Sequence, residues 1–128
     1  MSSVSTPKIS VIVIAYRMPG QLENTLYSLS PSYQHGVGVE DYEVIVMENS
    51  SADNLSADKV SALPENFRYQ LREESSVTPV YAVNEAFQLC RAPFICLMID
   101  GARMVSPGII RTALMAYAVT SQAVVVVP

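Results

Sequence analysis

Five short segments have patterns of apolar residues whose length and composition are typical of β-strands. They are residues 9–15, 42–47, 67–71, 94–99 and 123–127. The runs ISVIVIA, YEVIVM and FICLMI are apolar almost throughout, as strands are when both faces of a parallel sheet are covered. We expect these three to be buried, adjacent and central. In residues 67–71 apolar and polar side chains alternate, which predicts a half-exposed or edge strand.

Stretches with apolar residues three and four positions apart lie between the strands and predict helices. They cover about residues 19–29, 53–63, 79–90 and 106–117. In the first, Leu22, Leu26 and Leu29 fall on one face. Ser106 and Pro107 are residue types that favour the start of the last helix. Strands that alternate with helices predict an α/β fold, with a mostly parallel sheet and helices on both faces.

Polar residues directly follow three of the predicted strands, at the edge where such sheets bind ligands. Tyr16 offers an aromatic face to a base, and Glu48 can accept hydrogen bonds from a base or ribose. Asp100 can hold a metal ion or sugar hydroxyls. Each also has a purely structural interpretation, at the core edge, beside a helix N-terminus or in a turn. Because the fold brings the three strand ends together, we favour a binding site.

The composition favours a single folded domain over residues 1–128 and argues against several partners. Half of the residues are hydrophobic, and the net charge of −4 disfavours binding to nucleic acid or anionic lipid. No apolar run approaches the ~18 residues of a membrane span, and residues 1–7 lack a secretory pattern. Cys90 and Cys96 form no C-x-x-C pair, so we expect buried, reduced thiols in a cytoplasmic protein.

The turn after the first strand lacks the two common phosphate-binding motifs. It reads AYRMPGQLEN, which contains neither G-x-G-x-x-G nor G-x-x-x-x-G-K-[ST]. If the sheet binds a nucleotide, it must therefore use side chains at the strand ends.

Three segments carry motifs that occur in a fixed order between Lys8 and Val127. They read PKISVIVIAYRMPGQLENTLYSL, YEVIVMENSSAD and AVNEAFQLCRAPFICLMIDGARMVSPGII. They resemble, in turn, the opening strand and helix, the E-I-I-V-V-D-N-G-S-x-D strand and the D-x-D stretch of family-2 glycosyltransferases. The resemblance implies a GT-A fold, incomplete at its C-terminus, that binds a nucleotide-diphosphate sugar.

The resemblance also implies which residues form the donor site. They are Ala15, Tyr16, Arg17, Glu48, Asn84, Asp100 and Arg103. Tyr16 would lie at the base, Glu48 would replace the family's Asp at the base or ribose, and Asn84 would match a helix Asn near the donor. Asp100 would be the first acid of D-x-D and the metal ligand. In the family the two acids hold a divalent cation, Mg²⁺ or Mn²⁺, on the diphosphate.

The chain departs from the family pattern at several of these positions. Arg17 stands in place of Asn, while Ser50 and Glu85 each replace Gly. Ala102 replaces the second acid of D-x-D, so we expect metal affinity to fall. Arg103 lies nearby and could offset diphosphate charge directly, although a solvated turn arginine is the alternative.

The leading hypothesis is the donor-binding part of a glycosyltransferase, whose acceptor would be a glycan, a lipid or a small molecule. The alternative is a degenerate, non-catalytic nucleotide-binding or interaction domain of the same fold. A nucleotidyltransferase is a weaker possibility, because such enzymes usually have a glycine-rich basic loop after the first strand. A receiver domain is set aside, because it needs a Lys after its last strand and the run AVVVVP offers none. The family's catalytic base lies in a later segment, and His35 is assigned no catalytic role. We therefore expect an N-terminal fragment or a domain without the acceptor half.

Overall fold

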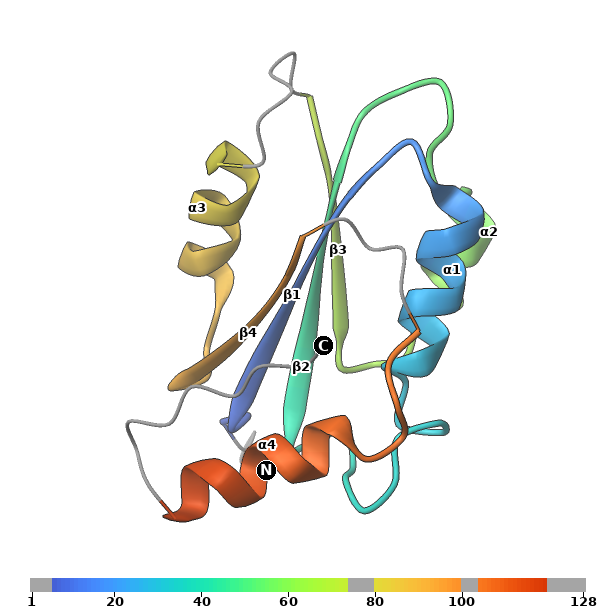
Figure 1. The fold of residues 1–128 in the computed structure, drawn as a ribbon. Helices are drawn as coiled ribbons and strands as arrows, with labels where there is room; N and C mark the ends of the chain where they lie inside the picture. The colour runs from blue at the N-terminus through green and yellow to red at the C-terminus, as the bar shows by residue number, and fades with distance from the viewer. Residues whose placement is uncertain (1–5, 74–79, 100–103, 120–128) are drawn as a thin grey trace, which may run out of the picture.

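The computed structural model describes residues 6–73, 80–99 and 104–119, where strands alternate with helices (Figure 1). The strands are β1 (Ile9–Tyr16), β2 (Tyr42–Asn49), β3 (Phe67–Arg72) and β4 (Phe94–Ile99). The helices are α1 (Pro19–Ser28), α2 (Ala57–Ser61), α3 (Val80–Leu89) and α4 (Ile109–Val119). The strand expected at residues 123–127 lies outside the described residues. No helix in the described ranges is both long enough and apolar enough to cross a membrane.

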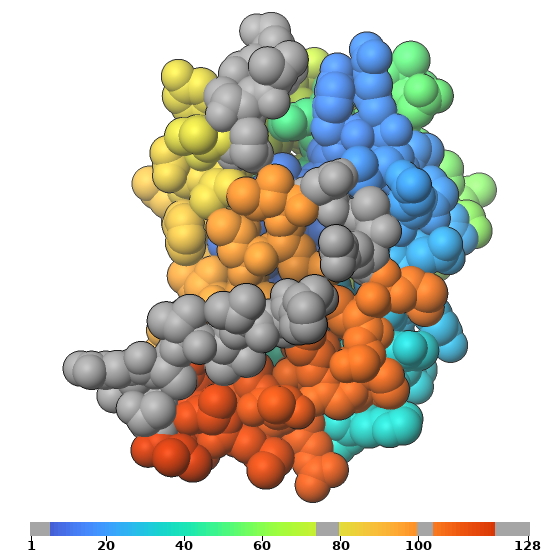
Figure 2. Space-filling model, viewed as in Figure 1, coloured from blue at the N-terminus to red at the C-terminus, as the bar shows by residue number. Residues whose placement is uncertain are grey.

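The strands form a parallel sheet in the order β3-β2-β1-β4. The predicted adjacency of the three apolar runs and the edge position of β3 are therefore confirmed. The expectation for β4 was wrong in one respect, since among the described strands it lies at an edge and is not fully buried. Leu97 and Ile99 are 43% and 52% exposed. The reason is that α3 packs against β1 and β2, so side chains of β4 reach the surface beside it (Figure 2).

Helices cover both faces of the sheet, as the sequence predicts, and β1 is the centre of the core. Seven of its eight residues are buried. Because successive side chains of a strand point to opposite faces, Val11 and Val13 pack beneath α1, α2 and α4, whereas Ile12 and Ile14 pack beneath α3. Figure 1 shows α3 on one side of the sheet and α1 with α2 on the other. These layers leave the strand ends as the place for polar side chains.

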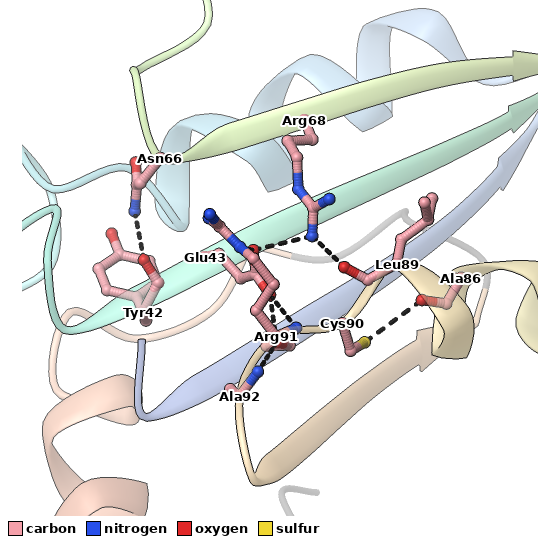
Figure 3. A network of polar contacts seen from close by, with 10 residues as sticks. Tyr42, Glu43, Asn66, Arg68, Ala86, Leu89, Cys90, Arg91 and Ala92 are labelled. Atoms are coloured by element: carbon pink, nitrogen blue, oxygen red, sulfur yellow. Dashed lines mark hydrogen bonds and ion pairs between the residues drawn. The ribbon is translucent and has the colours of Figure 1, made fainter. Parts of the chain in front are cut away.

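A buried carboxylate, Glu43, ties together the amino-terminal ends of the strands (Figure 3). It is 1% exposed. One oxygen accepts hydrogen bonds from Ser10 Oγ at 2.5 Å and from the Arg91 backbone N–H at 2.8 Å. The other accepts from Arg68 Nη2 at 2.9 Å and from Arg91 Nε at 3.0 Å. Glu43 of β2 therefore joins β1, β3 and the turn before β4.

Two opposing effects set the pKa of Glu43. Burial raises the pKa of Glu43. The hydrogen bonds from Ser10 and Arg91 and the charge of Arg68 lower the pKa by more than burial raises it, so the pKa lies below the ordinary 4.5. The ionised carboxylate therefore stabilises the fold fully above about pH 4.5, and this contribution is lost as the pH falls through the lower folded-state pKa.

We expect Glu43→Gln to lower the free energy of unfolding near neutral pH by on the order of 3 kcal/mol, because the new amide NH₂ would face N–H donors. The variant should also lose the part of the acid-induced drop in stability that protonation of Glu43 causes. Urea unfolding near neutral pH and well below pH 4.5 measures both effects. Glu65→Gln, which changes an exposed carboxylate, is the control. Equal destabilisation of the two variants would contradict the role given to Glu43.

Candidate functional site

The carboxyl ends of β1, β2 and β3 bring three polar side chains together at one edge of the sheet. The register pairs Tyr16 with Asn49, and Asn49 with Arg72. Asn49 Oδ1 accepts a hydrogen bond from Arg72 Nη1 at 3.2 Å, and Arg72 Nε lies 3.3 Å from Glu85 Oε2 of α3. The sequence analysis missed Asn49 and Arg72 as partners, because their contact depends on the register between β2 and β3.

Tyr16 and Arg17 lie where the chain leaves β1. The Tyr16 side chain is 43% exposed, and the Arg17 Cζ lies 5.1 Å from the centroid of its ring. Arg17 has a φ of 56°, in the left-handed region that non-glycine residues rarely adopt. Ala15 is buried and packs in the core on the α1 side. Of these residues, Tyr16 and Arg17 are therefore the ones whose side chains can meet a ligand.

Glu48, the predicted acceptor for a base or ribose, has a carboxylate that is fully buried and already hydrogen-bonded. Its two oxygens accept from the Leu55 backbone N–H at 3.0 and 3.1 Å, and the Tyr69 hydroxyl also donates to it. Burial first, then the hydrogen bond to Glu48 and its charge, raise the pKa of Tyr69 above its ordinary 10.0, so this hydroxyl remains a donor. A direct contact between Glu48 and a donor nucleotide requires Leu55 or Tyr69 to move.

The polar segment after β2 forms a turn held by side-chain hydrogen bonds. Asn54 Oδ1 accepts from the Ser51 N–H at 3.0 Å, and Asn54 Nδ2 donates to the Asn49 carbonyl at 3.0 Å. The Ser50 N–H donates to the Arg72 carbonyl at 2.7 Å. Side chains of this type compete with helix formation. This explains why α2 begins at Ala57 and is shorter than the predicted helix over residues 53–63.

Of the other predicted site residues, one lies on α3 and the rest lie outside the described ranges. Asn84 is exposed on α3, and no hydrogen bond of the described residues joins it to Tyr16 or Glu48. Asp100, Ala102 and Arg103 lie outside the described residues. Within the described part of the chain, no group of three or more His, Cys, Asp or Glu side chains could hold a metal ion.

The two cysteines and His35 take no part in this edge of the sheet. Cys90 and Cys96 are free thiols, and they are half-buried where the sequence predicted buried thiols. Burial raises the pKa of both, so the thiols stay protonated near neutral pH. His35 is exposed in the loop before β2, where its backbone N–H donates to the Pro107 carbonyl at 2.7 Å.

We expect Tyr69→Phe to lower the free energy of unfolding by about 1.5–3 kcal/mol, because the buried Glu48 carboxylate would lose a donor. Chemical unfolding near neutral pH measures the loss. Tyr27→Phe, which removes the hydroxyl of an exposed tyrosine on α1, should have little effect. If the two variants were equally stable, the Tyr69 hydroxyl would not be needed to hold Glu48.

Comparison with known proteins places this chain in a family. The sequence model described as "Glycosyl transferase family 2" matches residues 10–101. The crystal structure of S. aureus TarS is 22% identical over 87% of this chain, with a TM-score of 0.72. That of S. aureus TarS 1-349 is 20% identical over 94%, with a TM-score of 0.74.

These likenesses confirm the expected GT-A fold. The chain spans only 19% and 38% of the length of the two TarS chains. A search of curated protein sequences found no match. Because the family match covers residues 10–101 of 128, well over half of the sequence, the chain belongs to glycosyltransferase family 2.

Proposed function

We propose that residues 1–128 form the donor-binding domain of a glycosyltransferase that uses a nucleotide-diphosphate sugar. Membership of the family supports glycosyl transfer in general. The proposed donor site is supported mainly by one observation. Tyr16, Asn49 and Arg72 lie side by side at the carboxyl ends of parallel strands. In a sheet of this type, that edge is where ligands bind.

The proposed reaction moves one sugar to an acceptor hydroxyl of a glycan, a lipid or a small molecule. The hydroxyl oxygen attacks the anomeric carbon, and the bond from that carbon to the diphosphate oxygen breaks. The nucleoside diphosphate leaves with the bonding electron pair. The hydroxyl proton passes to a general base, for which we propose no residue of this chain.

The donor residues divide into those with a described geometry and those without. The exposed ring of Tyr16 would stack on the base, and the Arg17 guanidinium can reach an anionic group next to it. Ala15 would contribute through its backbone. Glu48 holds the Ser51–Leu55 turn beside the site, and its direct contact with the base or ribose stays a prediction. Asn84, Asp100 and Arg103 are proposed from the family resemblance alone.

A divalent cation, Mg²⁺ or Mn²⁺, is the cofactor that the family implies. The described residues offer no cluster of ligands for it, and Asp100, its proposed ligand, lies outside them. When bound, such a cation neutralises charge on the leaving diphosphate. Because Ala102 stands where a second acid is expected, we propose that the cation is held weakly and that Arg103 takes over part of its role.

The alternative is a degenerate, non-catalytic domain that keeps the fold and binds a nucleotide or a protein. Ala102 in place of an acid and Arg17 in place of Asn favour it. For either function we propose a cytoplasmic location, which the two free thiols support. Nucleotide binding without sugar transfer by the complete protein would favour the alternative.

Titration with UDP, GDP, CDP and dTDP and their sugars tests the donor site directly. We expect at least one to perturb the NMR signals of Tyr16, and Tyr16→Ala to weaken its binding by about ten-fold, since stacking on an aromatic ring is worth roughly 1–3 kcal/mol. Tyr27→Ala, at another exposed tyrosine, is the control. If no nucleotide perturbs Tyr16 or Glu48 at millimolar concentration, the proposed donor site is wrong.

Measuring the affinity for the same nucleotide with and without EDTA tests the role of the metal. We expect chelation to weaken binding only slightly in the parent chain. Arg103→Ala should weaken binding by roughly ten-fold, because a charge-assisted hydrogen bond contributes about 1.5–3 kcal/mol. Ala102→Asp should make binding more dependent on metal, because it restores a carboxylate ligand. Strong metal dependence in the parent, together with a silent Arg103→Ala, would show that Asp100 recruits the cation by itself.

A further inference from the structure

In the proposed function the ring of Tyr16 stacks on a nucleotide base, and this ring already has a cation beside it. The Arg17 Cζ lies 5.1 Å from the centroid of the Tyr16 ring, within the roughly 6 Å range of a cation–π contact. Since Tyr16 is about half exposed, this contact lies at the surface. A base that stacks on the covered face of the ring must therefore displace the guanidinium.

The backbone explains why these two neighbouring side chains meet. In an extended strand, successive side chains point to opposite faces. Arg17 instead has a φ of 56°, and it is the one non-glycine residue with a positive φ in the described part of the chain. This turn of the backbone brings its side chain back over Tyr16. Asn adopts the left-handed conformation more readily than Arg, so the arginine holds a conformation here that is unfavourable for its residue type.

The charge of Arg17 is also less compensated than that of Arg72 at the same edge of the sheet, or than the charges of Arg68 and Arg91 at the opposite edge. Arg68 and Arg91 pair with Glu43, and Arg72 pairs with Glu85. Among the described residues, no carboxylate forms an ion pair with Arg17. Its guanidinium is therefore available for an anion, and the anionic part of the proposed ligand is its diphosphate.

We propose that Arg17 makes nucleotide binding at Tyr16 depend on the diphosphate. This inference rests on the proposed function. Without phosphate, the guanidinium stays on the ring and competes with the base. A diphosphate draws the guanidinium away through charge-assisted, bidentate hydrogen bonds, and the ring face becomes free for stacking. Arg17 thus selects nucleoside diphosphates over nucleosides.

The magnitudes decide the direction of this exchange. A cation–π contact at an exposed site changes an equilibrium by roughly two- to five-fold. A hydrogen bond between two charged groups changes it by roughly ten-fold or more. The guanidinium therefore gains when it leaves the ring for a diphosphate, but it has no such gain with a nucleoside.

The experiment compares each nucleoside with its diphosphate on the 128-residue chain. Calorimetry or NMR titration with uridine and UDP, and with the guanosine, cytidine and thymidine pairs, identifies the pair that binds the parent best. In Arg17→Asn we expect that nucleoside to bind about two- to five-fold more tightly, because its competitor is gone. The ratio of diphosphate to nucleoside affinity should fall by roughly ten-fold.

Two further variants make the result specific to the guanidinium. Arg17→Lys keeps the charge without the planar fork, so its affinity ratio should lie between those of the parent and Arg17→Asn. Lys8→Asn removes one positive charge beside the opposite end of β1 and should leave the ratio unchanged. Because both affinities are measured on one sample, any loss of folded protein cancels in the ratio.

An unchanged ratio in Arg17→Asn would overturn the inference, and so would weaker nucleoside binding in that variant. Either result leaves the proposed donor site intact as long as Tyr16→Ala still weakens nucleotide binding by about ten-fold. If the parent binds none of the four pairs, the inference and the proposed function both fail.

Discussion

The parallel pairing of β1 with β2 and β4 is the constraint on which the rest of the structure depends. A strand buried on both faces and hydrogen-bonded along both edges can carry polar side chains only near its ends. In β1 these are Ser10 at one end and Tyr16 at the other. Ser10 joins the Glu43 network, whereas Tyr16 is exposed. The amino edge of the sheet is thus closed by internal hydrogen bonds, and the carboxyl edge is the one at which we propose that a ligand binds.

The two buried carboxylates of β2 show that burial alone does not set the role of an acid. Glu43 faces the α3 side and is held by two guanidinium groups, so its charge is compensated. Glu48 faces the other side, and its described partners are the Leu55 N–H and the Tyr69 hydroxyl, both uncharged donors. Through its hydrogen bonds to Leu55, Glu48 holds the turn after β2 beside the candidate site.

The sequence predicts the positions of the strands well because β-branched runs such as ISVIVIA are a local signal. It predicts their ends less well. The strand was expected to end at residue 47, yet Glu48 and Asn49 also belong to β2, because pairing with β1 and β3 continues to that point. The exposure of Ile99 was also missed, since the FICLMI run does not show that α3 covers a different pair of strands.

The contacts of the candidate site were the least predictable part, because they depend on register. The sequence places Tyr69 on the apolar side of an alternating strand, but only the pairing of Glu48 with Leu71 brings its hydroxyl to the carboxylate. The same register sets Arg72 beside Asn49. In contrast, the residue types at the strand ends could be read directly. Two departures from the family pattern, Arg for Asn at position 17 and Ala for an acid at position 102, change the local charge in the same direction. Each adds one positive unit relative to the family pattern, whereas Glu85 in place of Gly removes one, so the three departures together add one unit, in a chain whose net charge is −4. A diphosphate that is bound by arginine side chains rather than by a metal ion requires a charge shift of this sign.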